Sequence, residues 1–390
     1  MTSVSSASLI ANPQTTPTLF VDATSAHWTG LSVYINSFLD FVSHDYSASC
    51  SLVFIIYKQQ YAYFILSGIS KNNLYVIDDN PFFYFLPSLF SKSLSFFLYL
   101  RSQPPSSAVL LNSQIIILPL RLKLVKVWHA SLHLMPNLVA KYLSVAPIRF
   151  LRLRLETLLD TLNYSSYDAF IFPSYWSSLL VANSFAISPP KRSAVIPHDL
   201  TYLDASIKAD TRSSQPPGFL PNFIHIIYNA ALDIYKNHDL LIHWFDQCLD
   251  LPVNLVLIGP VVIPSVLNQF KSSLSWSKSR VLYLGRLSYC QVHSLYSKVD
   301  GAIFFSDTES FCYPLSEAIH FGLPFGFLDN PCNRSICQDQ GSPLSSSSDL
   351  RRFISALCND SLTPNHVISV CEPPFFSVRR TIEFSLSSEC

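Results

Sequence analysis

Two carboxylates, Glu309 and Glu317, flank a short polar segment with seven residues between them. The apolar run 301–305 that precedes them is typical of a strand, and Pro314 stands where a helix would begin. The pattern therefore predicts a strand, a loop and a short helix. Because the backbone N–H groups of such a loop and the N-terminus of its helix attract negative charge, we expect an anion-binding site here. Taken alone, two glutamates at this spacing are more often solvated surface carboxylates.

Lys236 is a candidate cation for the same site. It lies between a strand predicted over 223–228 and an amphipathic helix predicted over 237–249, with Asn237 as the N-cap. A lysine at such a junction can neutralise a diphosphate that also faces the helix N-terminus. By position alone, it is more often a solvated surface lysine.

Two residues near predicted strand ends in the first half of the chain are further candidates. His129 follows the strand predicted over 123–128, and a histidine at the carboxyl end of a parallel strand points into the crevice where α/β proteins bind ligands. His133 is the alternative, and a capping or packing role explains either histidine on position alone. Gly30 lies in a loop between the predicted strand 19–22 and a helix, where the plain interpretation is an ordinary turn.

Strands and helices alternate along the chain, which predicts parallel sheets covered on both faces. The length of 390 residues predicts two domains. We expect an N-terminal domain over 1–205, a Pro-, Gly- and Ser-rich linker over 206–222, a C-terminal domain over 223–365, and a segment 366–390 that returns to the first domain. Strands in the first half are predicted at 19–22, 51–57, 61–66, 73–77, 108–111, 114–118, 123–128 and 168–174. Later strands are predicted at 223–228, 254–258, 280–284, 301–305 and 324–328, and helices at 237–249, 261–274, 291–298, 314–321 and 348–359.

Composition limits the classes of partner. Lys plus Arg equals Asp plus Glu at 26 each, so no global charge attracts the chain to nucleic acid. Nine cysteines without a CxxC pair favour buried thiols in a reducing cytosol over a disulfide framework or a zinc site. The first residues lack the features of a signal peptide, and the apolar window 81–100 is too interrupted for a spanning helix. We therefore expect a cytoplasmic protein.

The region 142–162 is predicted to be helical. Four leucines share one face of this helix: Leu151, Leu155, Leu158 and Leu162. Three arginines lie nearby: Arg149, Arg152 and Arg154. The simplest interpretation is an amphipathic helix that packs its leucines on a sheet and leaves its arginines in water. The alternative is a basic interfacial helix that holds the protein on anionic lipid at the cytoplasmic face of a membrane.

The segment from Glu309 to Pro324 resembles the donor-site motif of the retaining glycosyltransferases of family 4. That motif reads Glu-Gly-Phe-Gly-Leu-Pro-x-x-Glu-Ala, followed by Gly-x-Pro. Here the chain reads Glu309-Ser-Phe311-Cys312-Tyr313-Pro314-Leu315-Ser-Glu317-Ala318, then Gly322-Leu-Pro324. The spacings of Lys236-Asn237 and of His129 to Pro136 are also similar to this family. The resemblance extends over residues 19–360 and is most specific over 280–328.

The resemblance implies the GT-B fold, in which two Rossmann-like parallel-sheet domains face each other across a cleft. It implies a metal-independent enzyme that moves a sugar from a nucleotide-sugar donor to a glycan or lipid-linked acceptor, with retention of configuration. Bacterial polysaccharide biosynthesis is the commonest setting of the family. No separate cofactor and no metal are expected, because the lysine and the helix dipole supply positive charge and no Asp-x-Asp element is evident.

The same resemblance gives each candidate a role. Lys236 and backbone N–H groups of the loop bind the diphosphate. The loop residues concerned are Phe311, Cys312, Tyr313 and Leu315. Glu317 accepts hydrogen bonds from the ribose hydroxyls, and Glu309 lies by the donor sugar or the phosphates. His129 contacts the transferred sugar or the acceptor, and Gly30 belongs to a loop that approaches the diphosphate and the acceptor.

More than four positions depart from the family pattern. Cys312, Asp199 and, as a milder change, Ser310 replace glycines. Ala130 replaces the aspartate after the histidine, and Ala231 replaces an arginine. These departures leave two other interpretations open. One is an inactive homologue that serves as a binding or scaffolding subunit, and the other is a different nucleotide-sugar enzyme with two Rossmann-like domains, such as an epimerase.

Overall fold

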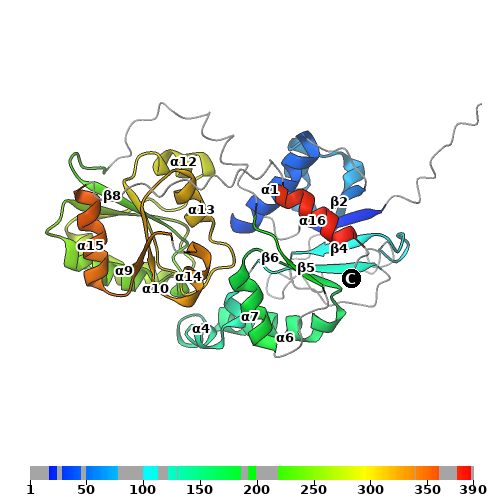
Figure 1. The fold of residues 1–390 in the computed structure, drawn as a ribbon, viewed down its shortest axis with the longest axis horizontal. Coiled ribbons are helices and arrows are strands. Elements are labelled where there is room, and N and C mark those ends of the chain that lie inside the picture. Colours follow the sequence, from blue (N-terminus) through cyan, green and yellow to red (C-terminus); the bar gives the residue numbers. More distant parts are fainter. Residues whose placement is uncertain are drawn as a thin grey trace, which may run out of the picture.

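The structure is a computed structural model of the 390-residue chain, and it contains two α/β domains (Figure 1). It describes residues 17–23, 29–44, 50–77, 100–112, 122–129, 131–185, 192–198, 218–338, 340–359 and 376–387. Several predictions lie outside these residues: the strand at 114–118, most of the window 81–100, most of the linker, and the environments of Ala130 and Asp199.

The N-terminal domain is a seven-stranded parallel sheet with strand order β3-β2-β1-β4-β5-β6-β7. Its strands are β1 (Thr18–Asp22), β2 (Ser51–Tyr57), β3 (Leu74–Ile77), β4 (Ala108–Leu111), β5 (Lys123–Val127), β6 (Ala169–Phe172) and β7 (Ser193–Val195). Its main helices are α1 (Thr29–His44), α2 (Tyr61–Leu66), α4 (Pro136–Ala140), α5 (Tyr142–Val145), α6 (Pro147–Asn163) and α7 (Tyr175–Phe185). In β1 the consecutive residues Leu19, Phe20 and Val21 are all fully buried, as expected for a strand covered on both faces.

The C-terminal domain is a six-stranded parallel sheet with strand order β10-β9-β8-β11-β12-β13. Its strands are β8 (Ile224–Asn229), β9 (Val253–Ile258), β10 (Val281–Tyr283), β11 (Gly301–Phe304), β12 (Phe325–Leu328) and β13 (Ser342–Leu344). Its helices are α9 (His238–Phe245), α10 (Pro264–Lys271), α11 (Leu274–Ser277), α12 (Tyr289–Tyr296), α13 (Tyr313–His320), α14 (Pro331–Cys337) and α15 (Ser347–Cys358). The predicted alternation of strand and helix is confirmed, with boundaries that shift by a few residues.

The last described helix, α16 (Phe376–Leu386), lies on the N-terminal domain (Figure 1). Its residues Val378 and Ile382 are buried in the core formed by β1, β2, β4 and α1. Just before β8, the first strand of the C-terminal domain, Phe219 is buried and stacks on His225, with ring centroids 4.0 Å apart. Phe219, from the end of the predicted linker, therefore packs into the C-terminal core.

The predicted strand at 61–66 is wrong, because this segment is helix α2. Its aromatic residues favour a strand locally. However, β2 and β3 pair in parallel, and a parallel pair needs a crossover connection rather than a hairpin. Phe64, on the inner face of α2, is fully buried and lies 5.7 Å from the ring of Phe54 in β2. Tertiary packing therefore decides the structure of this segment.

The prediction that α6 packs its leucine face on the sheet is also wrong. Leu151, Leu158 and Leu162 are 65%, 52% and 66% exposed, and Ile148 on the same face is 63% exposed. The buried residues of α6 lie on its other face: Leu153, Glu156, Leu159, Asp160 and Asn163. The buried carboxylates have partners, since Arg152 Nε donates to Glu156 Oε1 at 3.0 Å and His133 Nε2 lies 2.8 Å from Asp160 Oδ2.

Gly259, at the end of β9, marks a close approach between two strand ends. It adopts φ +138, and a Cβ at this position would lie 2.3 Å from the carbonyl oxygen of Ala230. We expect Gly259→Ala to lower the free energy of unfolding by about 3 kcal/mol or more, since both backbone strain and a backbone clash oppose it. Urea denaturation measures this change.

Gly68→Ala is the matched control for Gly259→Ala. Gly68 also has a positive φ, +83, but no atom lies within 4 Å of the Cβ position. Here we expect only the conformational cost of about 1–2 kcal/mol. Equal losses in the two variants would show that the close approach at Gly259 has no energetic consequence.

Candidate active site

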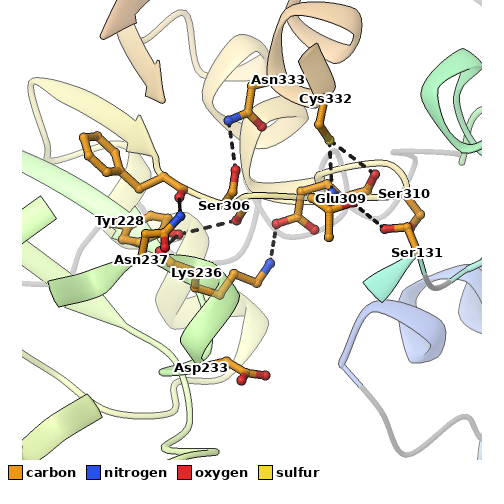
Figure 2. Close-up of polar contacts among 12 residues, drawn as sticks. Ser131, Tyr228, Asp233, Lys236, Asn237, Ser306, Glu309, Ser310, Cys332 and Asn333 are labelled. Atoms are coloured by element: carbon orange, nitrogen blue, oxygen red, sulfur yellow. Dashed lines mark hydrogen bonds and ion pairs between the residues drawn. The ribbon is translucent and has the colours of Figure 1, made fainter. Parts of the chain in front are cut away.

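Lys236 and Glu309 form an ion pair at the carboxyl edge of the C-terminal sheet (Figure 2). Lys236 ends a short 3-10 helix (Ile234–Lys236) after β8, and Glu309 lies in the loop after β11. These strands are neighbours in the sheet, so their carboxyl ends meet. The side chains are only 12% and 17% exposed. The structure thus brings together two of the three predicted catalytic residues.

The lysine of this pair is held in its charged form. Burial alone would lower the pKa of Lys236, but the Glu309 carboxylate, together with Tyr235 and Tyr228, raises it well above its ordinary value. The ammonium also lies 4.7 Å from the centre of the Tyr235 ring, where the ring's negative face attracts it. A permanent cation therefore lies in a site that is largely shielded from water.

The backbone around Lys236 is fixed by two side chains, those of Tyr228 and Asn237. Tyr228 OH donates a hydrogen bond to Lys236 O at 2.7 Å. Asn237 precedes α9 in a left-handed conformation, φ +50, and its side chain does not cap the helix as predicted. Instead, Asn237 Nδ2 donates to Phe305 O at 3.0 Å and to Asp307 Oδ1 at 2.7 Å, which ties the lysine loop to the glutamate loop.

Helix α14 holds the loop that carries Glu309. Asn333 Nδ2 donates to Ser306 O at 3.0 Å (Figure 2). Asn330 Nδ2 donates to the same oxygen at 3.0 Å. Glu309 N–H donates to Cys332 Sγ at 3.1 Å, and the thiol lies 3.6 Å from Glu309 O. Sequence reasoning missed Cys332, because the only signal was an unremarkable cysteine at the start of a later helix.

Cys312 occupies a backbone conformation that favours glycine. Its φ is +67, in the left-handed region, directly before α13. Its side chain is 8% exposed and belongs to the C-terminal core cluster that contains Phe304 and Leu315. Burial, and then the Glu309 carboxylate, raise the pKa of the Cys312 thiol well above its ordinary value. The cysteine is therefore a neutral, strained residue beside the ion pair.

The loop before α13 has two backbone donors that no described residue uses. The N–H groups of Phe311 and Cys312 have no hydrogen-bond partner within the described part of the chain. The Leu315 N–H, also predicted to bind the diphosphate, already has a partner, because it donates to Cys312 O at 3.1 Å. Two amides at the N-terminus of an eight-residue helix, next to a charged lysine, form an anion-binding arrangement.

Glu317 lies in the middle of α13 and is 2% exposed. Asn229 Nδ2, at the end of β8, donates to Glu317 Oε2 at 3.2 Å. Burial, and then the Glu317 carboxylate, raise the pKa of the neighbouring Tyr296 well above its usual value. The carboxylate therefore faces the sheet edge from the second turn of the helix, beside Asn229 rather than beside Glu309.

The N-terminal domain contacts the Glu309 loop directly. Ser131 Oγ lies 2.9 Å from Thr308 Oγ1 (Figure 2). Ser310 Oγ donates to His129 O at 2.6 Å. Ser177 Oγ donates to Ser310 O at 3.0 Å. The predicted residue His129 is thus on the opposite wall of the site. His133 is not, because it is buried with Asp160 inside the N-terminal domain.

A group of five rings fills the interdomain contact beside His129. The rings belong to Tyr34, His129, His198, Phe311 and Tyr313. His198 stacks on His129, with centroids 5.2 Å apart and planes at 15°, and on Tyr313, at 5.3 Å and 6°. Burial lowers the pKa of His198 to about 3 and that of His129 well below its usual value. Both imidazoles are therefore neutral.

In the sequence, His198-Asp199 is another possible His-Asp pair, but placing it in the site leaves too few residues to finish the first domain, so the predicted site does not include His198. The histidine follows β7, and its Nδ1 atom is buried with no hydrogen-bond partner among the described residues. Its position after the last strand of the first sheet was a usable signal, since ligands of α/β proteins bind at the carboxyl ends of strands. Gly30 differs from the prediction in another way, because it lies in the first turn of α1 and not in a loop.

No metal-binding cluster is evident in the part of the chain that the structure describes. There, no group of three or more His, Cys, Asp or Glu residues is placed to hold a metal ion. No described helix is both long enough and apolar enough to cross a bilayer.

Comparison with known proteins supports a two-domain glycosyltransferase architecture. Residues 211–342 match the family model described as "Glycosyl transferases group 1". A search of curated proteins finds no match to the chain. Among solved structures, Anabaena HepE in complex with UDP-glucose is 13% identical with a TM-score of 0.62, over 94% of this chain and 98% of that one.

Two further structures have the same architecture. A glycosyltransferase from Rickettsia africae is 12% identical with a TM-score of 0.61, over 95% of this chain and 98% of that chain. Sucrose-phosphate synthase from Thermosynechococcus elongatus is 13% identical with a TM-score of 0.60, over 88% and 90%. At these identities the likeness shows the fold. The chain has the GT-B fold of two Rossmann-like domains, and residues 211–342 resemble the group 1 glycosyl transferases.

Because Cys312 has a left-handed backbone conformation, we expect a glycine at this position to give a more stable protein than an alanine, which is the reverse of the usual order. Glycine adopts φ +67 without strain, whereas alanine keeps the strain and loses the buried sulfur. We expect Cys312→Gly to stay within about 1 kcal/mol of the wild type and Cys312→Ala to be about 1 kcal/mol less stable than Cys312→Gly. Urea denaturation measures both.

Ala318→Gly is the control for Cys312→Gly. Ala318 is fully buried inside α13, where glycine is disfavoured by about 1 kcal/mol. The expected order is therefore opposite at the two positions. If Cys312→Gly is less stable than Cys312→Ala, the strained backbone at this position contributes nothing.

Proposed function

We propose that this chain is a retaining glycosyltransferase that moves a sugar from a nucleotide-sugar donor to a glycan or lipid-linked acceptor. The observation that carries the proposal is the charged Lys236, paired with Glu309 and placed beside the two unused N–H groups at the start of α13. This arrangement suits a diphosphate with a sugar attached. Polysaccharide biosynthesis in the cytoplasm, where nucleotide sugars are available, is the setting we infer.

The proposed chemistry follows from where charge develops. When the glycosidic bond of a nucleotide sugar breaks, the leaving diphosphate gains negative charge. Lys236, the N–H groups of Phe311 and Cys312, and the dipole of α13 then stabilise the transition state more than the ground state. Because these groups already supply positive charge, the reaction we propose requires no metal ion.

Glu309 and Glu317 take different roles in this proposal. A bound diphosphate competes with Glu309 for Lys236, which releases the Glu309 carboxylate to accept hydrogen bonds from hydroxyls of the donor sugar. Glu317 accepts hydrogen bonds from the ribose, and its present donor Asn229 moves aside to admit them. The GT-B likeness to a protein crystallised with UDP-glucose makes that nucleotide sugar the first donor to test.

Donor binding is the direct test of the site. UDP-glucose at 100 times its Kd should add about 2.7 kcal/mol to the free energy of unfolding of the wild type. The double variant Lys236→Met with Glu309→Gln removes both charges without leaving one buried alone, and it should lose most of this stabilisation. Thermal denaturation with and without UDP-, GDP- and ADP-sugars measures the effect.

Lys271→Ala is the control, because Lys271 is an exposed lysine at the end of α10 in the same domain. It should bind the donor as the wild type does. The site assignment is wrong if no nucleotide sugar stabilises the wild type, or if the double variant binds as well. Donor that binds and is never hydrolysed or transferred in the presence of EDTA would favour an inactive homologue, and conversion to an epimeric sugar would favour an epimerase.

We further propose that α6 lies on an anionic membrane surface and so brings the enzyme to a lipid-linked acceptor. Its outward face is an apolar stripe of Ile148, Leu151, Leu158 and Leu162, all more than half exposed. The acidic residues of the helix, Glu156 and Asp160, are buried on the opposite side. By helical spacing, Arg152 and Arg154 flank the stripe, so its exposed surface is apolar and basic.

The third arginine of this helix has another function. The Arg149 guanidinium pairs with Asp233 of the C-terminal domain and lies 5.1 Å from the centre of the Tyr142 ring. Tyr142 OH donates to the same carboxylate at 2.5 Å. Arg149 therefore contributes to the interdomain contact and not to the surface that we assign to lipid.

Vesicle flotation tests the membrane proposal. The wild type should float with vesicles of phosphatidylethanolamine and phosphatidylglycerol, and less with neutral phosphatidylcholine vesicles. Leu151→Asn with Leu158→Asn should reduce the bound fraction at least tenfold, since each leucine contributes about 1.5–3 kcal/mol when fully buried in an apolar phase.

Leu66→Asn is the matched control for flotation, because Leu66 is 87% exposed at the end of α2. This variant should float like the wild type. Two results contradict the proposal: absence of lipid-dependent flotation of the wild type, and equal flotation of the Leu151 and Leu158 double variant.

A further inference from the structure

Three neighbouring strand ends of the N-terminal sheet are joined by a buried hydrogen-bond chain. Strands β1, β4 and β5 are adjacent in the sheet, and the chain runs through Asp22, Asn112 and His129 at their carboxyl ends. Asn112 Nδ2 donates to Asp22 O at 2.8 Å. Asn112 Oδ1 lies 2.7 Å from His129 Nε2. Asn112 itself is 8% exposed.

This chain allows only one orientation of the Asn112 amide. The carbonyl oxygen of Asp22 can only accept a hydrogen bond, so the amide nitrogen of Asn112 must face it. The amide oxygen then faces His129, and an oxygen without hydrogen can only accept. The proton between Asn112 and His129 therefore belongs to His129 Nε2.

A neutral imidazole with its proton on Nε2 has a lone pair on Nδ1. Burial, followed by His198 and Lys126, lowers the pKa of His129 and keeps the ring neutral. No described residue hydrogen-bonds to His129 Nδ1. In this state Nδ1 can accept a hydrogen bond and cannot donate one.

Two neighbouring rings, those of His198 and Tyr34, restrict rotation of the His129 imidazole ring. His198 stacks on it, and the Tyr34 ring packs edge-on at a centroid distance of 4.6 Å. Its backbone oxygen accepts a hydrogen bond from Ser310 Oγ at 2.6 Å, in the loop that carries Glu309. His129 is thus fixed at the contact between the domains. Its hydrogen-bond partner Ser310 directly follows Glu309, which we propose binds the donor sugar.

We propose that Asn112 is a positioning residue that holds His129 as the Nε2–H tautomer, so that Nδ1 accepts a hydrogen bond from a substrate hydroxyl in the cleft. This proposal rests on the glycosyl transfer proposed above for the identity of the substrate. A carboxylate partner would favour the imidazolium ion, whereas the amide of Asn112 orients a neutral ring.

The tautomer can be measured without any substrate. Histidine labelled with 15N gives distinct Nδ1 and Nε2 resonances for each tautomer, and the His129→Gln variant identifies the signals of His129. We expect the wild type to show His129 with a protonated Nε2 and an unprotonated Nδ1. A proton on Nδ1 in the wild type overturns the proposal.

Two substitutions at Asn112 separate its orienting effect from its packing. Asn112→Leu has a similar size and should give a mixture of His129 tautomers. Asn112→Asp should give the imidazolium and raise the pH at which His129 titrates, among its titratable neighbours His198, Lys126 and Tyr34. Asn163→Leu, a buried asparagine in α6, is the control that leaves the tautomer unchanged. A single Nε2–H tautomer in Asn112→Leu also overturns the proposal.

Activity assays then identify the hydroxyl. With UDP-glucose as donor, Asn112→Leu should lower kcat for turnover about tenfold, and Asn163→Leu should leave it unchanged. If the hydroxyl belongs to the donor sugar, Asn112→Leu also reduces the thermal shift by UDP-glucose relative to UDP. If it belongs to the acceptor, that shift is unchanged.

Failure of glycosyl transfer with the predicted tautomer intact would refute the proposed function and leave the orientation of His129 by Asn112 standing. An unchanged kcat in Asn112→Leu, with its tautomer mixed, would overturn the role in substrate binding.

Discussion

The mutual dependence of two largely buried charges governs the geometry of this site. An ammonium or a carboxylate that is shielded from water is costly unless it has a partner of opposite charge. Lys236 and Glu309 come from loops after different strands, so their pairing requires that these loops hold a fixed relative position. The side chains of Asn237, Tyr228 and Cys332 meet this requirement, because each hydrogen-bonds to the backbone of one of these loops. Much of the polar structure at this sheet edge therefore serves one ion pair.

The same loop connects the pair to the other domain. Thr308 and Ser310 contact Ser131 and His129 across the cleft, while Phe311 and Tyr313 complete a ring cluster with His198. A shift of the N-terminal domain would therefore displace the neighbours of Glu309, Thr308 and Ser310, because they bond directly to that domain. The loop that carries Glu309 therefore also forms part of the contact between the two domains.

The two sides of the site differ in charge: Lys236 on the C-terminal side is a cation, and the imidazoles of His129 and His198 on the N-terminal side are neutral. The C-terminal wall carries the permanent cation and the N–H groups of Phe311 and Cys312, which no described residue uses. The imidazoles of the N-terminal wall are kept uncharged by burial. Charge is thus available where a leaving diphosphate would lie. Neutral hydrogen-bond acceptors are available where hydroxyls would lie. The departures Cys312 and Ala130 are compatible with this division, since the thiol is neutral and packs in the core, and Asn112 supplies the partner of His129.

The sequence alone determined the repeated strand–helix units, the short helix after Glu309 and the placement of Lys236 at a strand end, because these follow from local periodicity and from Pro and Gly at helix ends. It misjudged 61–66 and the leucine face of α6, where the parallel crossover and the burial of Glu156 and Asp160 outweigh local pattern. Only the tertiary structure could show that Asn112 and Cys332 belong to the site, and that His198, which follows a strand end recognisable in the sequence, stacks on His129 there. Each acts through a contact with a residue 17 or more positions away, and no local pattern encodes such a contact. The charged residues of the site were readable in the sequence, whereas neutral residues such as Asn112 and Cys332, which hold the groups of the site in place, were not.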